Sequence, residues 1–436
     1  MNGWTAAELA EAAGGRLVAG NPDAPGPGSA TIDSREAGPG VLFVGLPGET
    51  VDGGSFASQA IDAGAWGVLV AEEHAEALAG AEAAVIACTD PLAALGSAAA
   101  AWRRHLGCAV IAITGSTGKT STKDITAAFL RPSRRTVATT GNYNTEIGLP
   151  LTILGAPEDT EVLVLEAAMR GPGQIAELTA IADPDVGIIV NIGPVHLELL
   201  GTVENIAAAK SELTAGMRPG TVAVLPAGEP LLEPHVREDQ EVVTFGPGGD
   251  LESLPEGIQV ELPSRHMESN ALAALAAVRA IGVEPEGRIE LQISGLRGER
   301  IALKDGVVVI NDCYNANPMS MRAALADLAE SAPGRRVAVL GDMLELGPDE
   351  RRFHAELGAQ ARDAGVDVLV TVGDLAVHAG PAWGGEDFVA VENAGQAAER
   401  LSEIVEPGDT ILVKGSRGVG LEVVAESLVA ERGAGE

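Results

Sequence analysis

Residues 109–123 read A-V-I-A-I-T-G-S-T-G-K-T-S-T-K. The apolar run 109–114 is typical of a strand buried on both faces of a parallel sheet, and a helical pattern follows the glycine-rich turn. Glycines let backbone N–H groups approach phosphate oxygens, and a helix N-terminus adds positive potential. The stretch therefore predicts a nucleotide site in an α/β domain, where Lys119 reaches the outer phosphates and the Thr120 hydroxyl ligates Mg²⁺.

This loop departs from the usual phosphate-loop pattern at one position. The pattern G-x-x-x-x-G-K-[ST] requires a glycine at 113, where this chain has Ile113. The alternative interpretation is a glycine turn that only joins a strand to a helix. We favour the nucleotide site because the strand, the loop, the Lys-Thr pair and the helix all agree with it.

The alternation of strand and helix continues along the chain. Continuous apolar runs predict strands at 41–44, 67–70, 84–87, 109–114, 162–166, 186–191, 307–311, 336–340, 368–372 and 410–413. We predict helices at 55–63 (with Ser55 as N-cap), 91–105 and 268–280, and a loop or weak strand region at 247–263. The pattern predicts an α/β protein of three domains: a small N-terminal domain 1–88, a central parallel-sheet domain of the phosphate-loop type 89–298 and a Rossmann-like domain 299–436.

Composition excludes several classes of protein. The chain has 436 residues, enough for about three domains, and 62 acidic against 29 basic residues give a formal net charge of −33. Such a surplus argues against a protein that coats nucleic acid or lies on an anionic membrane. No signal peptide or membrane span is visible, and the separate Cys88, Cys108 and Cys313 argue against disulfides or a thiolate zinc site. We therefore expect a cytoplasmic protein, and we expect a monomer.

Polar side chains follow two further predicted strands. Glu166 ends the strand 162–166, Asn191 ends 186–191, and His196 follows soon after. Ligands of open α/β sheets gather outside the carboxyl ends of the strands. Taken singly, Glu166 could be a solvated acid and His196 a loop histidine. Their shared place beside the phosphate loop favours a Mg²⁺ site, although histidine is a less usual Mg²⁺ partner than a carboxylate or hydroxyl oxygen.

Lys210 lies on the apolar stripe of a predicted helix. The stripe consists of Val203, Ile206, Ala207, Lys210 and Leu213. From this spacing alone we favour snorkelling, in which the ammonium group reaches out to water. The alternative is a buried amine with a lowered pKa, which can react with CO₂ to form a carbamate, an anionic oxygen ligand.

Together these motifs resemble the Mur ligase family of cell-wall amino-acid ligases over nearly the whole chain. The matching stretches are D-S-R (33–35), G-V-L-F (40–43), D-G (52–53), T-G-S-T-G-K-T-S (114–121), G-N-Y-N-T-E-I-G-L-P (141–150), M-R-G-P-G-Q-I-A-E-L (169–178), N-I-G-P-V-H-L-E-L-L-G (191–201), N-I-A-A-A-K-S-E-L (205–213), R-H-M-E-S-N-A-L-A-A (265–274), D-C-Y-N-A-N-P-M-S-M (312–321), V-L-G-D-M-L-E-L-G (339–347) and V-K-G-S-R (413–417). The N-A-N-P and L-G-D-M-x-E-L-G elements are most similar to the branch that adds D-alanyl-D-alanine.

The resemblance implies an ATP-dependent amide ligase of peptidoglycan synthesis. The terminal carboxylate of UDP-N-acetylmuramoyl-tripeptide would attack the γ-phosphate of ATP, and the amine of D-alanyl-D-alanine would then displace phosphate from the acyl phosphate. The domain 1–88 would bind the UDP substrate, 89–298 would bind ATP and two Mg²⁺ ions, and 299–436 would bind the dipeptide. The domains would close about hinges near 88–92 and 296–300 to exclude water.

The resemblance also implies roles for single residues. Lys119, Glu166, His196 and Lys210 would be catalytic. The ATP contacts would be Thr114, Gly115, Ser116, Thr117, Gly118, Lys119, Thr120, Ser121, Asn270, Arg300, Asn315 and Asn317. Thr120 and Glu166 would hold one Mg²⁺, and His196 with a carbamylated Lys210 the second, so the resemblance overturns the preference for snorkelling. The substrate contacts would be Ser34, Arg35, Asn142, Asn144, Thr145, Arg170, Lys414, Ser416 and Arg417.

Several positions differ from the family pattern, and other functions compete. Gly54 stands where a histidine is common, Ala167-Ala168 replaces Met-Gly, Met267 replaces a polar residue and Leu421 replaces methionine. One rival is another branch of the family, either the ligase that adds the third residue, whose D-N-P-R tetrapeptide is absent here, or folylpolyglutamate synthase. The other rival is a non-catalytic nucleotide-binding regulator, which would not need Glu166, His196 and Lys210 together.

Overall fold

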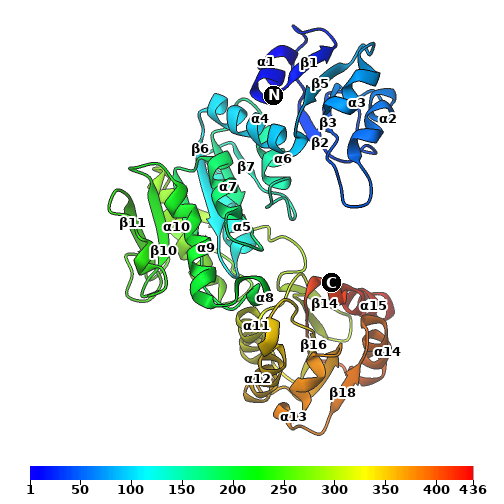
Figure 1. Ribbon diagram of the computed structural model, residues 1–436. Coiled ribbons are helices and arrows are strands. Elements are labelled where there is room, and N and C mark those ends of the chain that lie inside the picture. The colour runs from blue at the N-terminus through cyan, green and yellow to red at the C-terminus, as the bar shows by residue number, and fades with distance from the viewer. Residues whose placement is uncertain (436) are drawn as a thin grey trace.

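The computed structural model describes residues 1–435, so only Glu436 of the predicted third domain lies outside it. Three large sheets follow one another along an elongated molecule, with the N-terminal and C-terminal sheets at opposite ends (Figure 1). The predicted α/β class is confirmed. The domain boundaries at 88/89 and 298/299 stay a prediction.

The N-terminal sheet has the strand order β1-β5-β4-β3-β2, and only the β1–β5 pair is antiparallel. Its elements are α1 (Ala6–Ala12), β1 (Arg16–Ala19), β2 (Ser29–Thr31), β3 (Val41–Val44), η1 (Gly53–Phe56), α2 (Ala57–Asp62), β4 (Gly67–Ala71), α3 (Glu72–Ala75), η2 (Glu76–Leu78) and β5 (Ala84–Cys88). Ser55 is not the N-cap that we predicted. The Asp52 carboxylate accepts a hydrogen bond from the Gly54 N–H (2.9 Å) and caps the short turn η1, so α2 begins later, at Ala57.

The central sheet is entirely parallel, with the order β11-β10-β9-β6-β8-β7. Its elements are α4 (Pro91–Leu106), β6 (Ala109–Thr114), α5 (Lys119–Leu130), β7 (Thr136–Ala138), α6 (Gly148–Leu154), β8 (Val162–Glu166), α7 (Gln174–Ala182), β9 (Val186–Ile189), α8 (Leu197–Leu200), α9 (Val203–Gly216), β10 (Val222–Pro226), η3 (Glu233–His235), β11 (Glu241–Phe245) and α10 (Met267–Ala280). The strands β12 (Ile258–Val260) and β13 (Gly287–Ile289), which precede and follow α10 in the sequence, form a separate small parallel pair. The central strands β6, β8 and β9 all end at one edge, which places their following loops together.

The C-terminal sheet has the order β14-β15-β19-β16-β17-β18, with β14 alone antiparallel to its neighbour. Its elements are β14 (Glu299–Ala302), β15 (Val308–Asn311), α11 (Pro318–Ser331), β16 (Arg336–Gly341), η4 (Gly347–Asp349), α12 (Glu350–Asp363), β17 (Val368–Val372), η5 (Ala376–His378), α13 (Ala379–Trp383), β18 (Phe388–Val391), α14 (Ala394–Ile404), β19 (Thr410–Lys414), η6 (Arg417–Val419) and α15 (Glu422–Arg432). Two apolar clusters of its own, one on each face, form its core.

Helix α4 joins the first two sheets through a shared apolar core. This core runs from Leu9 and Ile86 of the N-terminal part through Trp102 to Leu163 of the central sheet. Trp4 packs edge-on against Trp102, with ring centroids 5.0 Å apart. Because only two residues separate β5 from α4, a hinge near 88–92 would have to work against this continuous core.

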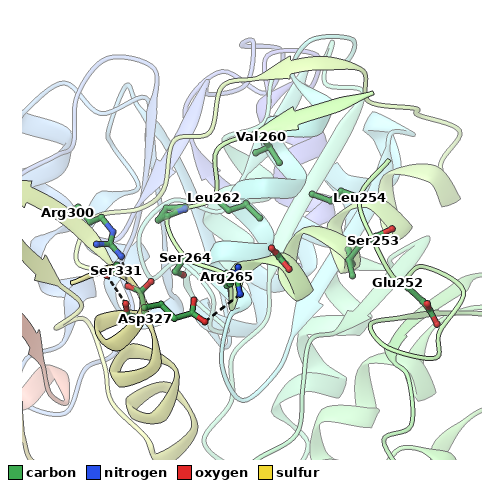
Figure 2. A pocket seen from close by; sticks show the side chains of 14 residues that line it. Glu252, Ser253, Leu254, Val260, Leu262, Ser264, Arg265, Arg300, Asp327 and Ser331 are labelled. Carbon is green, nitrogen blue, oxygen red and sulfur yellow. Dashed lines mark hydrogen bonds and ion pairs between the residues drawn. The ribbon is translucent and has the colours of Figure 1, made fainter. Parts of the chain in front are cut away.

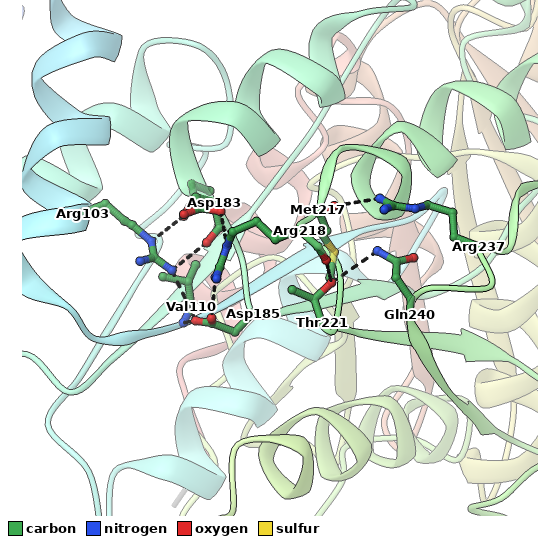
Figure 3. A network of polar contacts seen from close by, with 10 residues as sticks. Arg103, Val110, Asp183, Asp185, Met217, Arg218, Thr221, Arg237 and Gln240 are labelled. Atoms are coloured by element: carbon green, nitrogen blue, oxygen red, sulfur yellow. Dashed lines mark hydrogen bonds and ion pairs between the residues drawn. The ribbon is translucent and has the colours of Figure 1, made fainter.

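A buried arginine fixes the other end of α4 to the central sheet. Arg103 donates to the carbonyl oxygens of Ala182 (3.0 Å) and Asp183 (2.6 Å) and pairs with Asp185 (3.3 Å). Arg218 pairs with the carboxylates of Asp183 (2.6 Å) and Asp185 (2.7 Å), so the two arginines share Asp185 (Figure 3). Asp185 also accepts from the Val110 N–H at the start of β6 (2.8 Å). The network thereby sets the position of the strand that carries the phosphate loop.

Two further sequence expectations can be compared with the described residues. Cys88, Cys108 and Cys313 are all free and buried. Within residues 1–435, no helix combines the length and apolar character that a membrane span requires.

Candidate functional site

The glycine-rich loop lies between β6 and α5, as predicted. Gly118 has a φ of +75° in the left-handed region, and a Cβ at this position would lie 2.7 Å from the Asn270 Oδ1 atom. Position 118 therefore requires glycine, and Asn270 on α10 is brought directly against the loop. Because the first N–H groups of a helix have no partner within it, the start of α5 offers them to an anion.

Asn191 fastens the loop from the neighbouring strand. Its side chain accepts from the Thr117 N–H and donates to the Thr117 hydroxyl, both at 2.9 Å, and its carbonyl accepts from the Ser116 N–H at 3.0 Å. The Ser116 hydroxyl also accepts from the Gly193 N–H at 2.9 Å. The side chains of Ser116 and Thr117 are thus held by the protein itself, and the loop shape is fixed by the segment that leads to His196.

Lys119 begins α5 and turns back over the loop, where its Nζ donates to the Gly115 carbonyl at 2.8 Å. Burial lowers the pKa of Lys119; the charge of Glu166 opposes this shift and the charge of Arg297 adds to it. Arg297 is therefore near the loop, and its guanidinium lies 3.9 Å from the centre of the Tyr314 ring. We did not predict a role for Arg297, since a single arginine just before a strand carries no motif signal.

A carboxylate and a hydroxyl meet beside the loop. The Thr120 hydroxyl donates to Glu166 Oε2 at 2.7 Å, and the Asn144 amide donates to Glu166 Oε1 at 2.8 Å. Glu166 is buried, and its backbone N–H donates to the Thr139 hydroxyl at 3.0 Å. These are the oxygen ligands that Mg²⁺ prefers, so the residues fit the predicted first metal site. Ser121 and Thr114 are also buried, and the Thr114 hydroxyl has no hydrogen-bond partner among residues 1–435.

Lys210 is buried rather than snorkelling. The residue is 2% exposed in the middle of α9, and in the described part of the chain its amine makes no hydrogen bond or ion pair. Burial lowers the pKa of Lys210 well below its ordinary value, and the charge of Lys119 adds to this shift. The snorkelling that the spacing favoured is therefore wrong. A buried amine without a partner fits the carbamate that the resemblance implies.

His196 lies on the same side of the site. It has a φ of +52° and its Nδ1 atom lies 2.5 Å from Glu345 Oε2. Burial lowers the pKa of His196; the hydrogen bond and charge of Glu345 oppose this shift, whereas the charges of Lys119 and Lys210 add to it. His196, Lys119 and Lys210 therefore lie close enough to interact, which fits the predicted second metal site. Arg170 is joined to this group through Glu345 Oε1, 4.0 Å from its Nε atom.

Two of the residues predicted to contact the UDP substrate, Ser34 and Arg35, line a separate cavity. Gly53 and Phe56 of the N-terminal part and Ile147, just before α6, also border this space of ≈ 620 Å³. Arg35 is exposed and paired with Asp33. Ile147 belongs to the stretch that contains Asn142, Asn144 and Thr145, of which only Asn144 contacts Glu166. This stretch therefore links the cavity to the carboxylate beside the phosphate loop.

The predicted residues of the C-terminal part are only partly brought to the site. The buried Lys414 donates to Asp312 Oδ2 (2.7 Å) and to the Asn315 carbonyl (2.9 Å). Burial lowers the pKa of His266 at the start of α10, and the charges of Asp312 and Lys414 act on it in opposite directions, so this cluster faces the central sheet domain. Asn317 instead caps α11 by accepting from the Ser320 N–H, and Arg417 is exposed and paired with Glu422.

Arg300 lies in a cavity away from the phosphate loop. It donates to Asp327 at 2.7 Å (Figure 2). It lines a space of ≈ 690 Å³ that Glu268 and Leu272 of α10 also border. Asn270 touches the loop, and Glu268 and Leu272 each lie two residues from it along α10. Two residues turn a helix by roughly 200°, so the cavity lies on the opposite side of α10 from the loop. The structure thus does not bring Arg300 to the loop, and its predicted nucleotide contact stays a prediction.

A buried histidine supports the loop that carries Glu345. His354 is fully buried; its Nε2 accepts from the Met343 N–H (2.9 Å) and its Nδ1 lies 2.7 Å from the Glu350 carbonyl. Only a neutral imidazole can accept the first hydrogen bond. Burial accordingly lowers the pKa of His354, against the opposing effect of the hydrogen bond to Glu350.

This arrangement predicts a loss of stability in mild acid. Because the pKa of His354 is lower in the folded than in the unfolded state, the unfolded chain binds the proton first, and stability falls as the pH drops below about 6.5. Above that pH, His354 is neutral in both the folded and the unfolded chain, so its protonation no longer lowers the stability of the fold. We expect the melting temperature of the His354→Gln variant to vary less between pH 7.5 and 5.5 than that of the wild type. Equal slopes in the two proteins would mean that His354 does not titrate in this way.

Family comparisons agree with this geometry. Three family descriptions match the chain: "Mur ligase family, catalytic domain" at residues 29–103, "Mur ligase middle domain" at 113–278 and "Mur ligase, glutamate ligase domain" at 296–417. Among curated proteins, UDP-N-acetylmuramoyl-tripeptide–D-alanyl-D-alanine ligase of Bacillus subtilis is 37% identical, with 91% of this chain and 92% of that protein covered. The protein of the same name from Escherichia coli is 33% identical, with 91% and 93% covered.

Solved structures agree as well. The crystal structure of MurF from Acinetobacter baumannii has a TM-score of 0.85 at 30% identity and covers 98% of this chain and 99% of its own. MurF ligase from Thermotoga maritima in complex with ADP has a TM-score of 0.80 at 29% identity, with 92% and 97% covered. The three-part α/β architecture is therefore that of these ligases. The chain belongs to the Mur ligase family.

Proposed function

We propose that this protein is an ATP-dependent, ADP-forming ligase that joins D-alanyl-D-alanine to UDP-N-acetylmuramoyl-tripeptide in the cytoplasmic stage of peptidoglycan synthesis. The observation that carries the proposal is the convergence, around one phosphate loop, of Lys119, the Thr120–Glu166 pair and the buried Lys210, with the charges of both lysines acting on His196. The names of the curated relatives support the choice of substrates. A non-catalytic regulator would gain nothing from burying an unpaired lysine there.

The proposed reaction has two steps. A carboxylate oxygen of the tripeptide attacks the γ-phosphorus of ATP, the bond to the β-phosphate oxygen breaks, and ADP leaves. The amine of the dipeptide then attacks the acyl carbon, loses a proton, and the C–O bond to phosphate breaks. Lys119 and the amides of α5 hold the phosphates in line and neutralise charge that develops on the γ-phosphoryl oxygens.

Two Mg²⁺ ions, when bound, would supply further positive charge to the phosphates. We infer that Thr120 and Glu166 would hold one ion, oriented by the Asn144 amide. His196 and a carbamylated Lys210 would hold the other. The carbamate would turn the unpaired amine of Lys210 into an anionic oxygen ligand, and the bound ion would offset the cost of burying that charge.

We further propose that the three parts of the chain divide the substrates among them. Residues 1–88 would take the UDP end in the cavity at Ser34 and Arg35, residues 89–298 would bind ATP, and residues 299–436 would present the dipeptide through Lys414, Ser416 and Arg417. We infer that Arg297, whose charge lowers the pKa of Lys119, adds positive charge on the nucleotide side of the loop. We propose that the protein works as a monomer.

Phosphate release tests this proposal. We expect the protein with Mg-ATP to release phosphate only when UDP-N-acetylmuramoyl-tripeptide and D-alanyl-D-alanine are both present, with one pentapeptide formed per phosphate by mass spectrometry. Omitting either substrate is the control. Release without either substrate, or release that requires a folate and glutamate, would contradict the proposal and favour the rival family branches.

A further inference from the structure

One residue of the C-terminal part makes three contacts with the central part. Glu345 Oε2 lies 2.5 Å from His196 Nδ1, and Oε1 lies 4.0 Å from Arg170 Nε. The Glu345 carbonyl accepts from the Glu198 N–H at 3.3 Å. Both the side chain and the backbone of Glu345 therefore hold the segment that follows β9.

The loop that carries Glu345 is fixed by its own domain. Its neighbours donate backbone hydrogen bonds to buried side chains, from the Met343 N–H to His354 Nε2 (2.9 Å) and from the Leu344 N–H to the Ser416 hydroxyl (3.0 Å). Met343 and Leu346 are buried in the core between the sheet and α12. Glu345 itself has a φ of +63°, which the surrounding contacts must enforce. The carboxylate is thus presented from a rigid base.

The contact with Glu345 determines which ring nitrogen of His196 carries the proton. An ionised carboxylate can only accept, so Nδ1 must donate its proton to Glu345, and in the neutral imidazole the lone pair then lies on Nε2. A metal-ligating histidine usually donates its other N–H to a carboxylate in this way, which sets the tautomer and the ring orientation. His196 lies near Lys119 and Lys210, where the second metal ion is proposed.

We propose that Glu345 is a positioning residue that orients His196, so that the second metal site is complete only when the C-terminal part is docked on the central part. The inference rests on the proposed function, since that function assigns the metal to His196. Domain closure and catalysis would then be coupled. Glu345, which orients the metal ligand His196, belongs to the C-terminal part that is proposed to present the dipeptide. Metal binding and docking then stabilise one another.

The test measures metal binding and the histidine tautomer rather than turnover. Mn²⁺ is titrated by electron paramagnetic resonance into the protein saturated with a non-hydrolysable ATP analogue, and the His196 ring is observed by ¹⁵N NMR. We expect Glu345→Ala to weaken one of two Mn²⁺ sites by about 100-fold and Glu345→Gln, which keeps an acceptor, by about 10-fold. The Nδ1–H tautomer should be retained with Gln and lost with Ala.

A matched control separates position from charge. Glu198→Gln removes the same charge from an exposed side chain two residues from His196, and should leave both readouts as in the wild type. Wild-type Mn²⁺ affinity and tautomer in Glu345→Ala would overturn the inference. If that variant does not fold, unchanged Mn²⁺ affinity in Glu345→Gln overturns it instead. Neither readout uses the UDP substrate or the dipeptide, so failure of the proposed function would appear separately, as absent phosphate release in the wild type.

Discussion

Replacing Lys119 with methionine is expected to lower kcat for phosphate release by about 10³-fold, the range seen when one electrostatic donor to a transition state is removed. The amine of Lys119 bends over the loop to the Gly115 carbonyl, at 2.8 Å, which places a positive charge against the loop itself. Methionine keeps a similar length and apolar stem at the start of α5. The change therefore removes the charge and leaves the helix in place.

The effect should appear in kcat more than in the KM for the UDP substrate, because that substrate is predicted to bind in the cavity at Ser34 and Arg35, away from the loop. Lys304→Met is the control, since Lys304 is exposed in the C-terminal part. Steady-state kinetics measure both variants. If kcat of the Lys119→Met variant stays within tenfold of the wild type, Lys119 has no catalytic role.

Replacing Lys210 with methionine should lower kcat by about 10²- to 10³-fold, because the anionic ligand of one metal ion is lost. The same substitution should not destabilise the fold. Lys210 is buried with its amine unpaired in the described chain, so an apolar side chain of similar shape should raise the melting temperature or leave it unchanged. A variant that is folded and inactive separates a chemical role from a structural one.

The carbamate itself can be observed. In ¹³CO₂-saturated buffer the wild type should give a carbamate carbon signal by ¹³C NMR that Lys210→Met lacks, and added bicarbonate should not restore the activity of the variant. Full turnover in Lys210→Met would mean that the carbamate has no role. A wild-type signal that persists in the variant would assign the modification to another amine.

The sequence predicts best where burial is complete on both sides of an element. The strands β6, β8 and β17 lie at the predicted residues because each is a continuous apolar run inside a parallel sheet. The edge strands β14 and β18 were missed. Three of the four residues of β14 are exposed and two of its residues are charged, and β18 is a run of only four residues with none buried. Ser55 was wrong as a cap because Asp52, just before two glycines, makes the competing turn first.

The site residues, too, were predicted only where the local sequence carries a signal. Lys119 and Thr120 could be predicted because they follow a glycine-rich loop at the start of a helix, and Glu166 because it ends a recognisable strand. The helical period placed Lys210 on the buried stripe but could not say whether its amine reaches water, which depends on the neighbouring elements. No role was predicted for Arg297 or Glu345, although Glu345 lies in the L-G-D-M-x-E-L-G element. Both roles depend on contacts between parts of the chain more than a hundred residues apart.

The path of one oxygen atom tests the central claim most directly. The terminal carboxylate of the tripeptide in the UDP substrate is labelled with ¹⁸O, and the phosphate released on ligation to D-alanyl-D-alanine is analysed by mass spectrometry. If that carboxylate attacks the γ-phosphate and the amine then displaces phosphate, each released phosphate carries one ¹⁸O atom. Unlabelled phosphate, or AMP and pyrophosphate in place of ADP and phosphate, would contradict the account.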